Sequence, residues 1–163
     1  MQVTLSTTLG DIVLELDEAK APISSKNFAT YVDKGFYDGL IFHRVIPNFM
    51  IQTGAFTPDM KQKEGDKPIK NEWKNGLKNA KYAVAMARTS DPDSGSSQFF
   101  INTANNDFLD QARDGAAYAV FGKVVKGMDI VDKIGKVATT TKGGHGDVPT
   151  TPVIITKASR TEA

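Results

Sequence analysis

Short segments rich in β-branched and aromatic residues recur along this chain from residue 40 onward, and polar or turn-forming residues separate them. Their brevity and spacing favour an antiparallel barrel or sandwich over a parallel sheet. The segments are Leu40–Val45, Phe49–Thr53, Tyr82–Met86, Gln98–Asn102, Ala119–Val125 and Val153–Lys157. The sequence therefore predicts a mainly β fold.

A β-hairpin is predicted at the start of the chain. Apolar and polar residues alternate from Val3 to Leu16 on either side of the tripeptide Leu9-Gly10-Asp11. Alternation with a period of two places apolar side chains on one face of each strand, and the glycine supplies the turn.

Two short amphipathic helices are expected as well. The first begins near Pro22 and ends near Gly35, with apolar side chains spaced three and four residues apart between them. The second covers Met128 to Ile134, behind Gly127. Such helices are expected to cap the open ends of a barrel.

The length of 163 residues fits a single domain covering positions 1–163. A net charge of +1 provides no strong field for nucleic acid or an anionic membrane, so neither partner is expected. No apolar run approaches the roughly 18 residues that a spanning helix requires, and no basic and apolar leader is visible, so we expect a cytoplasmic protein.

Metal and thiol chemistry are not expected. The chain contains no cysteine, and its two histidines, His43 and His145, lie far apart in the sequence. We therefore expect no metal and no other cofactor. The stretches Pro58–Lys81 and Ser90–Ser97 are polar and are predicted to be exposed connections or binding rims. The glycine-rich stretch Thr139–Thr151 is predicted to be a flexible connection.

The most informative stretch reads F-H-R-V-I-P-N-F-M-I-Q-T-G, at positions 42 to 54. Residues two apart in a strand share a face, so Phe42, Arg44 and Ile46 are predicted to point one way. His43 and Val45 then point the other way, and we interpret His43 as a core histidine with satisfied hydrogen bonds. An arginine among apolar residues brings a cationic group to the edge of an apolar pocket.

The next strand is predicted to continue this pocket. Beyond the turn at Pro47-Asn48, Met50 and Gln52 share a face. Arg44, Phe49, Met50 and Gln52 are therefore expected to line one cleft. In the run Q-F-F-I-N at 98 to 102, Gln98 and Phe100 share a face, and Phe99 and Ile101 share the other. One phenylalanine is predicted to fill the core and the other the pocket. Further candidates are Phe108, Leu109 and Tyr118.

At these residues the chain resembles the cyclophilins, and the resemblance extends over nearly its whole length. The matching segments are Gly10-Asp11, K-G-F-Y-D-G at 34 to 39, the stretch at 42 to 54, Met86-Ala87, S-Q-F-F-I-N at 97 to 102, F-G-K-V at 121 to 124 and G-M-D-I-V at 127 to 131. The insert ending in P-I-K-N-E at 68 to 72 is similar to the bacterial cytoplasmic branch.

The resemblance implies a closed eight-stranded antiparallel β-barrel capped by two helices, with the binding groove outside the barrel. It also implies peptidyl-prolyl cis-trans isomerase activity on peptides and client proteins. Arg44 would be the catalytic cation, Gln52 would be the second catalytic residue, and Gln52 and Gln98 would be hydrogen-bonding partners. The substrate-binding residues would be Phe49, Met50, Ala87, Arg88, Gln98, Phe100, Phe108, Leu109 and Tyr118.

The sequence departs from the common eukaryotic pattern at several of these positions. Phe108 replaces tryptophan, Tyr118 replaces histidine, Arg88 replaces asparagine and Thr89 replaces alanine. Phenylalanine offers no N–H donor, so weakened cyclosporin binding is expected. Arg88 is expected to alter which residues are preferred beside the proline.

Two other classes of function stay open from the residues alone. One is a proline-peptide binding module without catalysis, and an intact Arg44 argues against it because a pure binder needs no transition-state donor. The other is a small-molecule carrier of lipocalin type. Bulky inward side chains would fill the interior of so small a barrel, which argues against a carried ligand. A chaperone role is compatible with isomerase activity. A monomer is expected.

Overall fold

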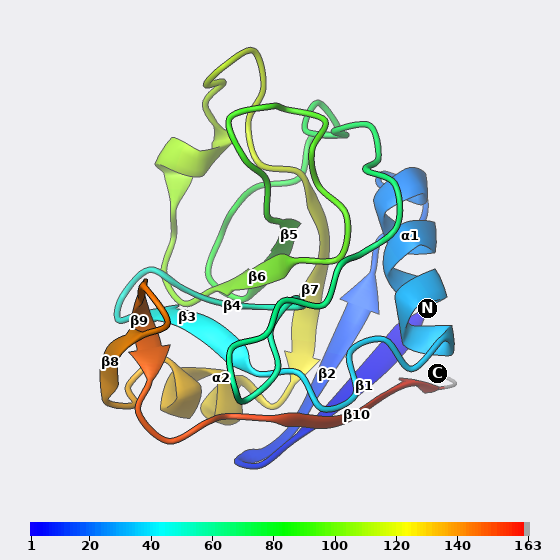
Figure 1. The fold of residues 1–163 in the computed structure, drawn as a ribbon. Coiled ribbons are helices and arrows are strands. Elements are labelled where there is room, and N and C mark those ends of the chain that lie inside the picture. The colour runs from blue at the N-terminus through cyan, green and yellow to red at the C-terminus, as the bar shows by residue number, and fades with distance from the viewer. Residues whose placement is uncertain (162–163) are drawn as a thin grey trace.

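The computed structural model describes residues 1–161, and its principal element is one curled antiparallel sheet (Figure 1). The sheet has eight strands in the order β10-β1-β2-β7-β5-β6-β4-β3. The strands are β1 (Gln2–Thr7), β2 (Gly10–Leu16), β3 (Phe42–Ile46), β4 (Met50–Thr53), β5 (Ala83–Met86), β6 (Phe99–Asn102), β7 (Val120–Lys126) and β10 (Ile155–Thr161). Each predicted strand is present within a few residues of its expected bounds.

The sheet curls into a barrel-like shape whose closure is only partial. Its edge strands β3 and β10 form no continuous ladder, and a single isolated bridge between Ile41 and Ile154 joins the segments before them. Backbone bonds from Phe42 N to Val153 O (3.0 Å) and from Ile155 N to Leu40 O (2.8 Å) extend this junction. The predicted antiparallel eight-stranded architecture is confirmed, while the description of the barrel as closed was too strong.

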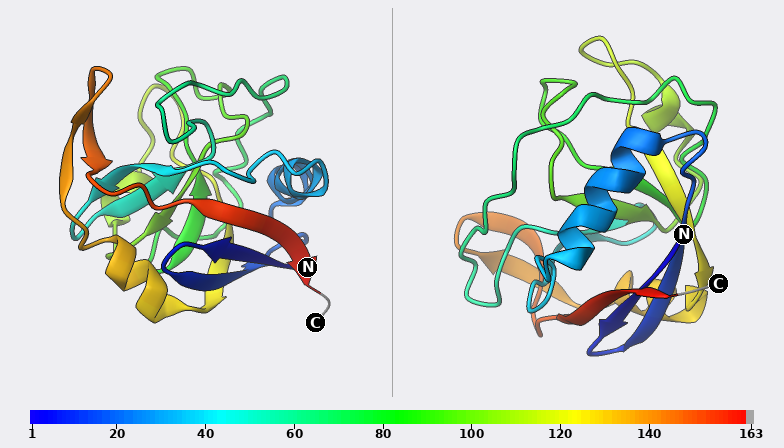
Figure 2. Two further views of the ribbon diagram at one scale, coloured as in Figure 1. Left: turned by 60° about the horizontal axis from the view of Figure 1, so that its bottom comes forward. Right: turned by 90° about the vertical axis from the view of Figure 1, so that its right-hand side faces the viewer.

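Two helices, well apart from each other, pack against the curled sheet, and both contribute side chains to its interior (Figure 2). Helix α1 (Pro22–Asp33) packs against β10 and β7, and α2 (Met128–Ile134) packs against β2. Proline at the first helical position starts α1 at no cost, because the first N–H groups of a helix have no internal partner. The Glu72 carboxylate, far along the chain, accepts hydrogen bonds from Ser24 N (2.6 Å) and Ile23 N (3.2 Å). Both helices match the prediction.

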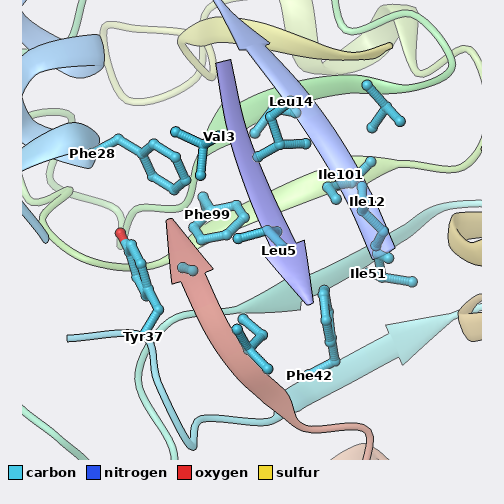
Figure 3. Packing of buried hydrophobic residues seen from close by; sticks show 14 of the residues in the cluster. Val3, Leu5, Ile12, Leu14, Phe28, Tyr37, Phe42, Ile51, Phe99 and Ile101 are labelled. Atoms are coloured by element: carbon cyan, nitrogen blue, oxygen red, sulfur yellow. The ribbon is translucent and has the colours of Figure 1, made fainter. Parts of the chain in front are cut away.

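The inside of the curled sheet is filled with apolar side chains (Figure 3). Val3, Leu5 and Leu14 from the first hairpin meet Phe28 from α1 and Phe99 from β6, and none of them is more than 1% exposed. The rings of Phe28 and Phe99 pack edge to face, with their centroids 5.0 Å apart. A packed interior leaves no room for a carried small molecule, so the lipocalin alternative does not fit this fold.

Strands β4, β5 and β6 are buried on both of their faces. Ile51, Val84 and Ile101 point into the interior cluster. Their neighbours Met50 and Phe100 belong to a second apolar cluster, on the outer face of the same strands. The alternation of side chains along a strand explains both clusters. A functional cleft can therefore lie outside the barrel and still have an apolar floor.

The segment from Thr139 to Thr151 is more regular than predicted. It contains the two-stranded sheet of β8 (Thr139–Lys142) and β9 (His145–Pro149), and β9 packs against β3. The turn between them uses Gly143 and Gly144, which both have positive φ. Glycine adopts such angles without strain, so the residues interpreted as a flexible connection form a hairpin turn.

Candidate active site

A cavity of about 100 Å³ lies on the outer face of strands β3, β4 and β6. Its lining residues are Arg44, Phe49, Met50, Gln52, Ala87, Arg88, Phe100, Leu109 and Tyr118. Pockets for whole small molecules measure about 300–1,000 Å³. This cavity is therefore suited to a single side chain of a larger ligand.

The register of the sheet brings the polar and apolar parts of the cavity together. Arg44 on β3 pairs with Gln52 on β4, and Gln52 pairs with Phe100 on β6. Directly opposite residues of adjacent strands have side chains on the same face. Ile46 and Met50 form the neighbouring pair of the same face. A cation, an amide and an aromatic ring thus stand in one row across three strands.

A β-bulge in β3 determines which side chains accompany Arg44. The register shifts between Phe42 and Arg44, so that Phe42 lies opposite Thr53 and Arg44 lies opposite Gln52. The extra residue is His43, and Phe42 consequently joins Val45 in the interior cluster. The prediction that Phe42 shares the face of Arg44 was wrong, because strict alternation fails at a bulge.

Arg44 is exposed at the mouth of the cavity. Its side chain takes part in no hydrogen bond or ion pair within residues 1–161. A guanidinium carries five N–H donors. These donors are available to a group that enters the cavity, because no carboxylate of the described chain neutralises them.

Gln52 and Gln98 are linked to each other and not to Arg44. Gln52 Nε2 donates to Gln98 Oε1 at 3.0 Å. The segment after Gln52 lies close to the segment before Gln98. This close approach depends on Gly54, because a Cβ at that position would lie 2.5 Å from Ser97 O. Its φ of 107° is also unfavourable for residues with a side chain. The glycine that ends the F-H-R motif therefore keeps the two glutamines within bonding distance.

The walls of the cavity are apolar and aromatic. Met50, Phe100 and Leu109 are buried, at 2%, 4% and 8% exposure. The Tyr118 ring meets Phe100 edge to face at a centroid distance of 5.8 Å. Phe49 completes this cluster from the turn between β3 and β4. Water is largely excluded from such a surface, which strengthens polar contacts made at its edge.

Phe108 lies outside the cavity. It is 44% exposed and stacks on Phe49, with ring centroids 5.7 Å apart and an angle of 26° between the planes. The residue sits in a 3-10 helix, η1 (Asp107–Asp110), which the sequence analysis did not predict as a helix. Phe108 therefore contacts the cleft through Phe49 and extends its rim with an exposed aromatic surface.

Arg88 lies at the opposite side of the cleft. Its Nη2 donates to Arg113 O at 2.9 Å, and its guanidinium carbon lies 5.0 Å from the centre of the Tyr118 ring. The Nε and Nη1 atoms are buried and have no hydrogen-bond partner. The backbone N–H of neighbouring Ala87 is bound to Gln98 O at 3.1 Å. Arg88 is thus a second cation of the cleft, fixed against an aromatic wall.

His43 points away from the cleft and packs on the Phe56 ring, at a centroid distance of 4.6 Å. The pKa of His43 is lowered to about 4, mainly by burial and to a smaller extent by the nearby His145 and Arg44. The prediction of a core histidine is correct, but its hydrogen bonds are not all satisfied, because the buried Nδ1 has no partner. His145 packs on Phe56 at 5.0 Å, so the two histidines are closer than their sequence separation indicated.

A larger hollow, of about 670 Å³, lies elsewhere on the surface, between the ends of β2 and β7 and the loop near Leu77. Its charges are largely balanced on its rim, where Met1 N contacts Glu18 at 3.0 Å and Lys123 contacts Glu15 at 4.0 Å. The smaller cleft is the stronger candidate for a functional site, because there a cation without an ion-pair partner in residues 1–161 stands beside an apolar cavity.

Within residues 1–161, no cluster of His, Asp or Glu side chains could hold a metal ion. None of the helices in the same range is long and apolar enough to cross a membrane.

The structure gathers most of the predicted site residues around one cavity. Gln98 and Phe108 lie one contact away, behind Gln52 and Phe49 respectively. Sequence patterns did not indicate the three buried asparagines behind the cavity, Asn79, Asn102 and Asn106. A polar residue at the end of an apolar strand, as at Asn102, was the available signal.

Comparison with known proteins identifies the family. The family model for cyclophilin type peptidyl-prolyl cis-trans isomerase/CLD matches residues 2–160. A peptidyl-prolyl cis-trans isomerase of Acinetobacter baylyi is 60% identical over 94% of this chain and 81% of its own. Peptidyl-prolyl cis-trans isomerase B of Escherichia coli is 52% identical over 98% of this chain and 99% of its own.

The fold comparison agrees. The crystal structure of a cyclophilin type peptidyl-prolyl cis-trans isomerase of Cryptosporidium parvum, determined in the presence of the dipeptide Ala-Pro, superposes with a TM-score of 0.85. It is 26% identical in sequence, and the match covers 100% of both chains. The family match and the isomerase relatives extend over the segments that build the cleft. This chain belongs to the cyclophilin family of peptidyl-prolyl cis-trans isomerases.

Proposed function

We propose that this isomerase binds the ring of a proline residue in the cavity of about 100 Å³ and turns the preceding peptide bond beside Arg44. The observation that carries the proposal is an exposed, unpaired arginine at the mouth of a small apolar cavity. The solved relative of Cryptosporidium parvum was determined in the presence of the dipeptide Ala-Pro, which supports a prolyl ligand for this chain.

The reaction requires no bond to be made or broken. Rotation about a peptide bond disrupts amide resonance, at a barrier of roughly 18–20 kcal/mol, and uncatalysed X–Pro exchange takes tens to hundreds of seconds. In the twisted state the prolyl nitrogen becomes pyramidal and regains a lone pair. A donor placed at that nitrogen stabilises the twisted state more than the planar one, which is differential binding of the transition state.

Arg44 is proposed as this donor. Its charge acts at the edge of an apolar surface, where a preorganised hydrogen bond is worth more than in water. Shortening the exchange time from about 100 s to about 1 ms needs about 7 kcal/mol, at roughly 1.36 kcal/mol for each factor of ten. A charged donor and the fixed orientation of the ring together can supply this amount.

The remaining cleft residues are proposed to hold the substrate. Met50, Phe100 and Leu109 would surround the proline ring. The paired amides of Gln52 and Gln98 would bind a substrate carbonyl and orient it relative to Arg44. The further substrate-binding candidates are Phe49, Ala87, Arg88, Phe108 and Tyr118.

Substrates are proposed to be proline-containing peptides and client proteins in folded or unfolded form. We propose that residues 1–163 act as one monomeric domain in the cytoplasm, without nucleic acid as a partner. Cyclosporin is proposed to bind weakly, because Phe108 has no N–H to donate.

The experiment is to measure prolyl exchange in an Ala-Pro-Phe peptide by NMR at matched enzyme concentrations. Arg44→Ala is expected to reduce kcat/KM by about 100-fold to 1,000-fold, the effect of losing one preorganised donor. Arg44→Lys retains the charge but lacks the planar guanidinium, so only partial recovery is expected. Lys123→Ala removes an exposed cation of the larger hollow and should retain full activity.

Two results would count against the proposal. Folded wild type that fails to accelerate exchange would leave a proline-peptide binding module as the better description. Equal loss of activity in Lys123→Ala and Arg44→Ala would place the chemistry away from the small cleft.

A further inference from the structure

Three buried asparagines lie directly behind the cleft. Asn79 and Asn102 are 0% exposed, and Asn106 is 3% exposed. They come from three different parts of the chain: the long connection before β5, the end of β6, and the loop after it. We call these three residues the asparagine relay. Burying an amide is costly unless its donors and acceptors are bonded, so the partners of the relay are informative.

The relay is a continuous chain of side-chain hydrogen bonds. Asn106 Nδ2 donates to Asn102 Oδ1 at 2.7 Å. Asn102 Nδ2 in turn donates to Asn79 Oδ1 at 3.0 Å. Asn79 Nδ2 donates to Asp110 Oδ1 at 2.9 Å. The donors therefore all run in one direction, and the chain ends on a carboxylate that can only accept when ionised.

Each amide of the relay also donates to one backbone carbonyl. Asn106 Nδ2 binds Phe49 O at 2.8 Å, and Asn79 Nδ2 binds Tyr118 O at 3.2 Å. Asn102 Nδ2 binds Ala83 O at 3.2 Å in the same way. Carbonyl oxygens only accept hydrogen bonds, so these contacts fix the orientation of each amide. A flipped amide would bring two oxygens together.

Two of these carbonyls, those of Phe49 and Tyr118, belong to the walls of the cleft. Phe49 and Tyr118 line the cavity, and their backbones are held by the two ends of the relay. Leu109 forms the third wall, and backbone hydrogen bonds hold it in place. Leu109 N donates to Asn106 O at 2.9 Å, and Tyr118 N donates to Leu109 O at 3.1 Å. A backbone hydrogen bond from Asn106 N to Asn79 O, at 2.8 Å, also joins the first and last residues of the relay.

We propose that the asparagine relay positions the walls of the proline pocket and so sets the rate of isomerisation. This inference rests on the proposed function of the cleft. The three walls come from segments up to about seventy residues apart, and no strand ladder connects Phe49 with Leu109 or Tyr118. Asn106 bonds directly to the Phe49 and Leu109 backbones, and Asn102 and Asn79 connect it to the Tyr118 carbonyl. It fixes backbones behind the cleft and leaves the side chains directed into the cavity.

A purely stabilising role is the alternative, and the chemistry of the relay argues against it. An apolar layer of the same shape would fill the space without the risk of unsatisfied amides, because replacing both partners of a buried hydrogen bond can be nearly neutral. A fully bonded polar network instead selects a single geometry. A pocket that must fit a twisted bond benefits from such selection, since small misplacements cost rate.

The test compares relay variants with a variant that is destabilised by a buried change away from the cleft. Asn102→Leu removes the central amide at similar volume, and Asn106→Ala removes the bonds to Asn102 and Phe49. Val3→Ala serves as the control, because Val3 is buried in the interior cluster on β1, away from the cleft. Exchange kinetics, binding of the peptide and the methyl NMR signals of Met50 and Leu109 are measured for each.

For both relay variants we expect kcat/KM to fall by about tenfold to 100-fold, the scale for misplaced groups in an active site. Dissociation constants for the ground-state peptide should change by less than about threefold. The Leu109 methyl signals should shift or broaden, while Val3→Ala leaves kinetics and these signals unchanged. If Asn102→Leu does not fold, the same measurements on Asn106→Ala alone test the inference.

The inference is overturned if the relay variants keep the kcat/KM of wild type, or if Val3→Ala loses activity to the same degree. It is also overturned if binding weakens as much as kcat/KM falls. Arg44→Ala is assayed in parallel. Equal activity of Arg44→Ala and wild type would refute the proposed function of Arg44, and would leave the contrast between the relay variants and Val3→Ala as a separate result.

Discussion

Acid should destabilise this protein through His43, and the size of the effect follows from its burial. The pKa of His43 is lowered from 6.5 to about 4 in the folded chain, mainly because burial disfavours the charged imidazole. The unfolded chain binds this proton more readily, so stability falls as the pH decreases below about 6.5. The loss is complete once the pH is below the folded pKa. At roughly 1.36 kcal/mol per pH unit, it amounts to about 3 kcal/mol.

The assay is urea unfolding of wild type and His43→Leu at several pH values between 7 and 4. His43→Leu removes the titrating group and the unpartnered Nδ1 while retaining an apolar contact with Phe56. Its stability should therefore decline less with acid than that of wild type, by about 3 kcal/mol over the range. His145→Gln, which changes the exposed histidine on the other side of Phe56, should keep most of the decline. Parallel curves for wild type and His43→Leu would refute the reasoning.

Other positions give further predictions. Glu72→Ala should lower stability by about 1 kcal/mol, the usual value of a helix N-cap, because its carboxylate binds the first N–H groups of α1; urea unfolding beside Glu64→Ala, an exposed change in the same loop, would show no difference if the cap is unimportant. Arg88→Met should lower the ratio of kcat/KM for Glu-Pro over Lys-Pro peptides by about threefold to fivefold, as loss of a partly exposed ion pair does; an unchanged ratio would exclude Arg88 as a selector. Phe108→Trp should strengthen inhibition by cyclosporin by about tenfold, through one added N–H donor; unaltered inhibition in an exchange assay would contradict this.

Local patterns were sufficient to predict most of the architecture. Alternation gave the first hairpin and the short strands, and proline and glycine marked the ends of α1. The same reasoning failed at β3, where the bulge at His43 transfers Phe42 to the interior. A bulge depends on the partner strand and on the packing of His43 against Phe56, and neither is visible in a local pattern. The β8–β9 hairpin was missed because its strand residues are mostly exposed and polar.

The residues that line the cleft were predicted more fully than the buried asparagines that lie behind it. Spacing placed Met50 and Gln52 on one face and Arg44 in the same cleft, and later segments supplied aromatic and apolar candidates. The resemblance to cyclophilins added Ala87 and Arg88. The asparagine relay was not predictable in this way. Asn79 and Asn106 lie in loops, where asparagine is common for turn geometry alone, and only the tertiary arrangement brings them to Asn102.

The most direct test of the account is to locate a bound proline ring during catalysis. Intermolecular NOEs from the ring protons of an Ala-Pro peptide can be measured to methyl-labelled protein under conditions of accelerated exchange. We predict contacts with Met50 and Leu109, in the small cavity beside Arg44. Contacts with Leu16 and Val120 instead, in the larger hollow, would contradict the assignment of the active site.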